Sequence, residues 1–60
     1  DIDEAVYLSD RVLVLDGSPA RIAADIPVTC PRPRTQLETR ESAEFLAARH
    51  QVYEVIFGTR

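Results

Sequence analysis

The sequence contains no methionine, lysine or tryptophan, and it has only one cysteine, one histidine and two glycines. The absence of methionine indicates that the chain is not a complete unprocessed translation product, and we therefore expect a fragment of a longer protein. A lone cysteine cannot form a disulfide within the chain, so Cys30 is expected to be a buried or bystander thiol of the kind found in a reducing compartment.

The size and charge of the chain exclude further classes of protein. At 60 residues it can form one small domain, which buries roughly 60% of its unfolded surface. Such a domain is only marginally stable without a disulfide, a structural metal ion or a partner protein. The net charge of -3, with seven scattered arginines, argues against a sequence-independent nucleic-acid binder. No apolar run approaches the roughly 20 residues that span a bilayer. Some of the apolar surface is therefore expected to pack against another protein surface.

Catalytic and metal chemistry find little support in the residues. A phosphate-binding P-loop needs the motif G-x-x-x-x-G-K-[ST], and this chain has two glycines and no lysine. Cys30 and His50 are separated by a proline-rich connector and have no evident third partner for nucleophilic catalysis. His50 has no second histidine near it and is expected to be an ordinary surface residue. We predict no catalytic, cofactor-binding or metal-binding residue in this chain.

The N-terminal part has the pattern of a short helix followed by a strand. Apolar residues recur at helical spacing over residues 2–9, and acidic residues, which favour a helix N-terminus, come first at Asp1, Asp3 and Glu4. Residues 11–16 read RVLVLD, an apolar run typical of a strand covered on both faces. In an isolated chain, one face of that strand would be bare.

A hairpin is predicted next, because residues 16–19 read Asp-Gly-Ser-Pro and Gly17 can adopt a positive φ. Residues 20–28 alternate between apolar and more polar positions, which is the pattern of a strand with one more solvent-exposed face. Pro27 lacks an amide donor and fits an edge strand or the end of strand pairing, so the second strand of the hairpin is expected to be an edge strand. We predict an α+β arrangement in which residues 1–28 form one unit.

Residues 29–38 form a connector, because Pro31 and Pro33 favour an extended chain. A solvated linker is the favoured interpretation. Two alternatives stay open: Arg32 and Arg34 could pair with acidic residues of a partner or with lipid phosphates, or the segment could be a polyproline ligand.

Residues 39–60 form the third unit, in which residues 39–57 are predicted to be one amphipathic helix that Gly58 ends. Arg40 with Glu44, and His50 with Glu54, have the spacing of helical ion pairs. Arg49 falls within the apolar face, where it must either extend its charge to water or find an acid. The predicted candidates for an interface on this wide face are Phe45, Arg49, Val52 and Ile56.

Residues 1–15, reading DIDEAVYLSDRVLVL, resemble the segment after the switch histidine of ABC-transporter ATPase subunits, T-H-D-x-x-E-A-x-x-L-A-D-R-V-x-V-L. The matching residues are Asp1, Glu4, Ala5, Leu8, Asp10, Arg11, Val12, Val14 and Leu15. Ser9 replaces the usual alanine, and Ala20 stands where glycine is common. The Pro-Arg-Pro-Arg stretch is similar to one in the nitrate, sulfonate and taurine branch of that family.

The resemblance implies a fragment of a P-loop NTPase α/β domain from which the switch histidine, one residue before Asp1, is missing. ATP and Mg²⁺ would be bound by other parts of the parent, with a second ATPase subunit and membrane permease subunits as partners at the cytoplasmic side of the inner membrane. By the same analogy Glu4, Asp10 and Arg11 would stabilise the helix and turn behind the switch loop without touching nucleotide.

An interaction module is the rival interpretation. The hairpin and the final helix could bury their apolar faces against each other and a second copy, or the connector and final helix could be a regulatory appendage. Self-association of the isolated chain is expected under each of these interpretations, so it does not discriminate between them.

Overall fold

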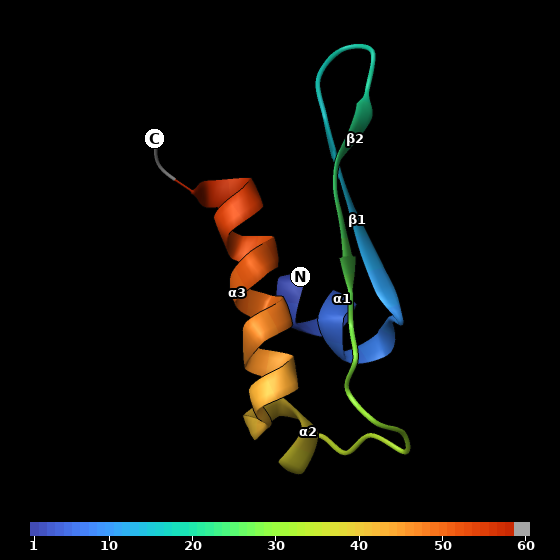
Figure 1. The fold of residues 1–60 in the computed structure, drawn as a ribbon, viewed down its shortest axis with the longest axis vertical. Coiled ribbons are helices and arrows are strands. Elements are labelled where there is room, and N and C mark those ends of the chain that lie inside the picture. Colours follow the sequence, from blue (N-terminus) through green and yellow to red (C-terminus); the bar gives the residue numbers. More distant parts are fainter. Residues whose placement is uncertain (59–60) are drawn as a thin grey trace.

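The computed structural model describes residues 1–58. It contains α1 (Ile2–Leu8), β1 (Arg11–Asp16), β2 (Arg21–Pro27), α2 (Glu38–Glu41) and α3 (Ala43–Phe57). Figure 1 shows α3 along one side of the molecule and the β1–β2 hairpin along the other, with α1 between them. The predicted α+β arrangement of helix, hairpin, connector and C-terminal helix is therefore confirmed for the described residues.

Helix α1 begins as its sequence predicts. The carboxylate of Asp1 caps the helix by accepting a hydrogen bond from the amide of Asp3 at 3.0 Å. The helix ends at Leu8, one residue before the predicted end, because Ser9 has the extended backbone angles φ −101° and ψ 156°. The last turn of α1 contains no basic residue, so its terminal carbonyl groups need donors from elsewhere.

The hairpin pairs β1 with β2 in antiparallel register, and Gly17 adopts the predicted positive φ of 90° in the turn. The register shifts between Val14 and Leu15, which pair with Ala24 and Ile22. Pairing ends at Pro27 as predicted. On β1, Leu13 is 46% exposed and Leu15 is 62% exposed, which confirms that the strand lacks a cover over part of its surface.

The prediction of one continuous helix over residues 39–57 is wrong. The helix breaks at Ser42, whose ψ of 154° ends α2 and whose hydroxyl accepts a hydrogen bond from the amide of Phe45, so that Ser42 caps α3. The predicted pair between Arg40 and Glu44 is wrong for the same reason, because Arg40 belongs to the short α2 and pairs with Glu4 at 3.0 Å. The predicted unit 39–60 also includes two residues that lie outside the described range.

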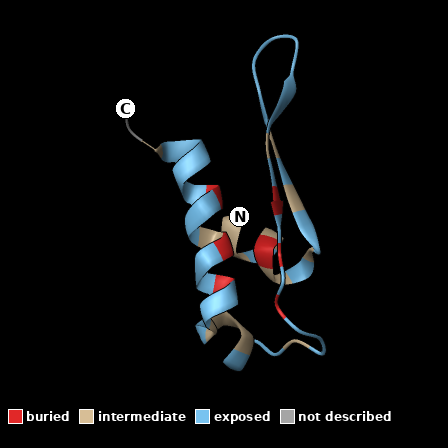
Figure 2. Ribbon diagram, viewed as in Figure 1, coloured by how far each residue is buried: buried red, intermediate tan, exposed pale blue. Residues whose placement is uncertain are grey.

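The core lies where α1, the end of the hairpin and α3 meet, and Figure 2 shows its buried residues facing the space between α3 and the hairpin. The most deeply buried large side chains are Phe45 and Val6. Among residues 1–58, the buried residues are Val6, Ile26, Val28, Cys30, Phe45, Ala48 and Val52. The prediction that Cys30 is a buried thiol is confirmed.

The molecule is extended for its length. Its radius of gyration is 12.0 Å, whereas about 10 Å is typical of a compact domain of this size. In the part of the chain that the structure describes, ten large hydrophobic side chains are exposed, among them Leu15, Ile22, Leu37 and Phe57. Within residues 1–58, none of the helices has the length and apolar character that crossing a membrane requires.

Candidate functional site

The C-terminal end of α1 is held by Arg34, a residue that the sequence assigned to a solvated linker. That prediction is wrong for Arg34, whose side chain is only 3% exposed. Its guanidinium donates hydrogen bonds to the carbonyls of Tyr7 at 2.8 Å, Ser9 at 2.8 Å and Cys30 at 3.0 Å. A cation at the carbonyl end of a helix is favoured by the helix dipole as well. Arg34 therefore replaces the basic last turn that α1 lacks.

Asp10, one of the predicted structural residues, lies beside this buried arginine. Its carboxylate pairs with Arg32 at 3.1 Å and lies 3.9 Å from Arg34. Arg32 also donates to the carbonyl of Leu8 at 3.2 Å. The backbone carbonyl of Asp10 accepts a hydrogen bond from the amide of Val28. Asp10 thus connects the end of α1, the hairpin and the connector.

Arg11, the second predicted structural residue, forms a cross-strand pair with Asp25. Two hydrogen bonds of 3.0 Å and 2.8 Å join its guanidinium to the two carboxylate oxygens. The hydrogen bond from Arg11 lowers the pKa of the Asp25 carboxyl, and the hydrogen bond to Asp25 raises the pKa of Arg11. Both side chains are exposed, so the pair contributes little to the free energy of unfolding.

The first turn of α1 pairs with the C-terminal helices. Glu4, the third predicted structural residue, accepts a hydrogen bond of 3.0 Å from Arg40 in α2. Asp3 accepts one of 2.6 Å from Nε of Arg49 in α3. The Arg40 guanidinium lies 5.2 Å from the centre of the Tyr7 ring, a favourable cation–π geometry. Each of the three predicted structural residues thus forms an ion pair within the chain.

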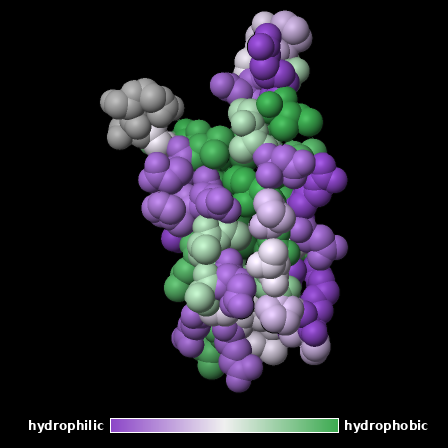
Figure 3. Space-filling view, viewed as in Figure 1, coloured by the Kyte–Doolittle hydropathy of each residue, from purple (hydrophilic) through white to green (hydrophobic). Residues whose placement is uncertain are grey.

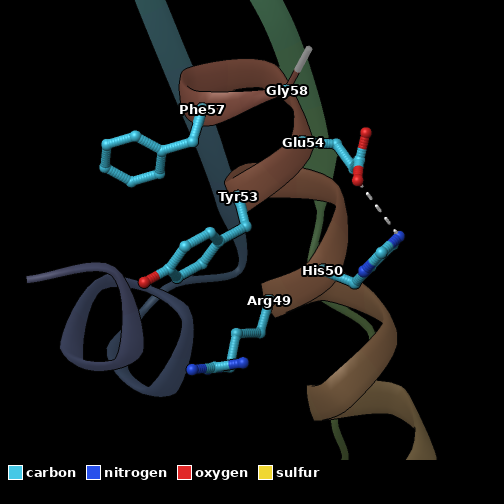
Figure 4. Close-up of a pocket in the computed structure, with 6 residues that line it drawn as sticks. All are labelled: Arg49, His50, Tyr53, Glu54, Phe57 and Gly58. Carbon is cyan, nitrogen blue, oxygen red and sulfur yellow. Dashed lines mark ion pairs between the residues drawn. The ribbon is translucent and has the colours of Figure 1, made fainter.

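The four predicted interface residues have different environments in the structure. Phe45 and Val52 are each 2% exposed and belong to the chain's own core, whereas Ile56 is 47% exposed. Arg49 finds its acid within the chain, in Asp3. As Figure 4 shows, its side chain extends from α3 toward α1. Among these four residues, Ile56 remains the apolar candidate for an external contact.

An open hollow lies along the outer side of α3 and is lined by Arg49, His50, Tyr53, Glu54, Phe57 and Gly58 (Figure 4). His50 lies 3.8 Å from Glu54, the predicted helical pair, and its side chain is 74% exposed. The Tyr53 ring is packed against Phe57 and against the Arg49 guanidinium. Among the residues that line the hollow, His50 and Glu54 form an ion pair, and no nucleophile with an orienting base lies among them.

Metal chemistry has no evident location either. Over residues 1–58, no group of three or more histidine, cysteine or acidic side chains is arranged to hold a metal ion. The site that the structure does assemble is a set of arginine contacts around α1, which hold the helix at both ends.

Sequence reasoning missed the role of Arg34 because an arginine that follows a proline in an extended connector carries no periodic signal. Its carbonyl partners in α1 and at the capping residue Ser9 lie 25 to 28 positions away in the chain. One signal was available: the predicted helix over residues 2–9 has neither a glycine at its end nor a basic last turn. Such a helix requires distant donors for its carbonyl groups.

The chain is similar to three relatives whose names describe ATP-binding or transport proteins. A protein of Brucella melitensis biotype 1 named as an ATP-binding protein is 46% identical over 57 residues, 95% of this chain and 24% of the relative. An aliphatic sulfonates import ATP-binding protein of Xanthomonas axonopodis pv. citri is 46% identical over 88% of this chain and 23% of its own length. The nitrate transport protein NasD of Klebsiella oxytoca is 36% identical over 95% of this chain and 22% of its own.

The chain thus spans less than a quarter of the length of these relatives. No family model and no solved structure matches it.

Proposed function

We propose that the chain is a C-terminal piece of the ATP-hydrolysing subunit of an ABC importer, because it is homologous to a segment of ATP-binding proteins, one of which is named as an ABC transporter protein. The imported solutes we propose are small anions such as nitrate, sulfonate or taurine. The observation that carries the proposal is the identity of 46% over 95% of the chain to an ATP-binding protein. Names of relatives that import sulfonates or transport nitrate support the class of solute.

Within that subunit, the role we propose for residues 1–28 is structural. Helix α1 and the hairpin would follow the switch-histidine loop in a P-loop NTPase domain and hold it in place. The contacts of Glu4, Asp10 and Arg11 support this role, because each fixes α1 or the hairpin to another part of the chain. The piece would itself be inactive, with ATP and Mg²⁺ bound by the rest of the domain.

The proposed partners are the rest of the nucleotide-binding domain, a second ATPase subunit and the membrane permease subunits. The complex would lie at the cytoplasmic side of the inner membrane, with this subunit peripheral to it. The bare strand surface that contains Leu13 and Leu15 supports a covering by the remainder of the domain. Figure 3 shows apolar surface where the hairpin faces the C-terminal end of α3.

The coding region upstream of Asp1 tests this proposal. We expect Thr-His immediately before Asp1, preceded by an acidic Walker B strand and, farther upstream, by a P-loop. The full-length product should then hydrolyse ATP. A start codon or a cleaved leader immediately before Asp1 would refute the proposal.

A self-associating or regulatory module is the second candidate, and the exposed side chains of Leu46 and Ile56 on α3 favour it. Deleting residues 39–60 from the full-length protein would then alter regulation or assembly and leave ATP binding unchanged. Loss of ATP binding in that deletion would instead make α3 a structural part of the nucleotide-binding domain.

A further inference from the structure

Helix α1 is too short to hold its own position. It has seven residues, and isolated helices shorter than about 12–15 residues are marginal in water. Val6, on one face of α1, is fully buried in the core, which anchors the middle of the helix. The direction in which the helix points must be fixed by contacts at its two ends.

Three arginines from the part of the chain after the hairpin make those contacts. Arg34 binds the terminal carbonyls of α1, Arg40 binds Glu4, and Arg49 binds Asp3. We call Arg34, Arg40 and Arg49 the arginine clamp. Its members contact opposite ends of α1, because Asp3 and Glu4 belong to the first turn. A rigid segment held at both ends and in its middle has a fixed direction.

The two arginines at the first turn are themselves held by aromatic rings. The Arg49 guanidinium lies 5.2 Å from the centre of the Tyr53 ring, within α3. The Arg40 guanidinium lies 5.2 Å from Tyr7 and 6.0 Å from the ring of Phe45, which is 2% exposed. Stacking of this kind restricts the arginine side chain before it meets its acid. The clamp therefore transmits the position of α2 and α3 to the first turn of α1.

We propose that the arginine clamp is a positioning device for ATP hydrolysis in the whole subunit. Residues 34–49 fix the direction of α1 and, through its first turn, the loop that enters α1 at Asp1. This inference rests on the proposed function, because it requires the switch loop to precede Asp1. The clamp arginines are positioning residues and do not contact nucleotide.

The kinetic consequence is specific. Displacing a catalytic group by about 1 Å can lower a rate on the order of 100-fold. ATP binding depends mainly on other parts of the domain. Loss of the clamp should therefore lower kcat while leaving the KM for ATP nearly unchanged, whereas a purely structural role would reduce the amount of folded protein and spare kcat per nucleotide site.

A charge exchange at the first turn tests the proposal in the full-length ATPase, assembled with its transporter. We expect Asp3→Arg and Arg49→Asp each to lower kcat per nucleotide site by about tenfold or more. The KM for ATP should stay within about twofold of the unmodified enzyme. The double variant, which restores an ion pair of reversed polarity, should recover most of the lost kcat.

Milder variants keep the test decisive if a charge reversal prevents folding. Arg34→Lys and Arg49→Gln should lower kcat by smaller factors and increase amide hydrogen exchange within α1. Arg21→Gln is the matched control, because Arg21 forms no ion pair within residues 1–58. An active enzyme whose kcat and α1 exchange are unchanged in both mild variants would overturn the clamp and leave the proposed function standing. An unmodified full-length protein without ATP hydrolysis would overturn both.

Discussion

Replacing Arg34 by methionine should destabilise the chain more than any other single change at a polar residue. Methionine keeps most of the apolar stem and removes the guanidinium, which donates to three carbonyl groups at 3.0 Å or less. A hydrogen bond to a charged group contributes about 1.5–3 kcal/mol, and a neutral one about 1 kcal/mol. Because water can reach part of the vacated space, we use about 1 kcal/mol for each bond and expect a loss of about 3 kcal/mol.

That loss is large relative to the total free energy of unfolding of the chain. A domain of 60 residues has a free energy of unfolding of about 3–9 kcal/mol. Arg34→Lys should lose about 2 kcal/mol, because one ammonium group cannot reach the carbonyls of α1 and of Cys30 together.

Urea unfolding followed by far-UV circular dichroism, at several protein concentrations, measures the effect. For an m-value of about 1 kcal/mol/M, the midpoint of Arg34→Met should fall by about 3 M. Arg21→Met, at an exposed position on the hairpin, is the control and should change stability by less than about 0.5 kcal/mol. The reasoning is refuted if Arg34→Met has the midpoint and m-value of the unmodified chain.

Three further changes test other parts of the structure. Ser42→Ala removes the cap of α3 and should lower the free energy of unfolding, measured with urea, by about 1 kcal/mol. An unchanged free energy of unfolding would contradict the helix break at Ser42. Phe45→Ala should cost about 3–5 kcal/mol, and a cost below about 1 kcal/mol would place Phe45 outside the core. The pKa of Asp25 is lowered in the folded state, so its contribution is present above the ordinary value of 3.8 and is lost as the pH falls below it. The Asp25 carboxyl should accordingly titrate below 3.8 by NMR and return toward that value in Arg11→Gln.

The elements with local signals could be predicted from the sequence. The strand over residues 11–16 has the predicted bounds, because its apolar run is followed directly by an Asp-Gly turn. The acidic start of α1 and the end of pairing at Pro27 also depend on one or two neighbouring residues. Local chemistry of this kind is visible in the sequence.

The helix break and the clamp could not be predicted by the same means. Ser42 lies within a stretch whose helical periodicity continues on both sides. The periodicity alone therefore predicted one helix where the structure has α2 and α3. The partners of Arg34 and Arg49 lie across the fold, and Arg49 is 46 positions away from Asp3 in the sequence. Such pairs depend on how helices pack, and no spacing rule along the chain encodes them.

The most direct test of the clamp is the hydrogen exchange of the arginine Nε–H groups, measured by NMR on the folded chain. We predict that the Arg34 Nε–H is protected, because it donates to the Cys30 carbonyl within a side chain that is 3% exposed. The Nε–H of the exposed Arg21 should exchange at the rate of an unprotected arginine. Equal exchange rates at Arg34 and Arg21 would show that Arg34 does not form these hydrogen bonds, and would contradict the arginine clamp.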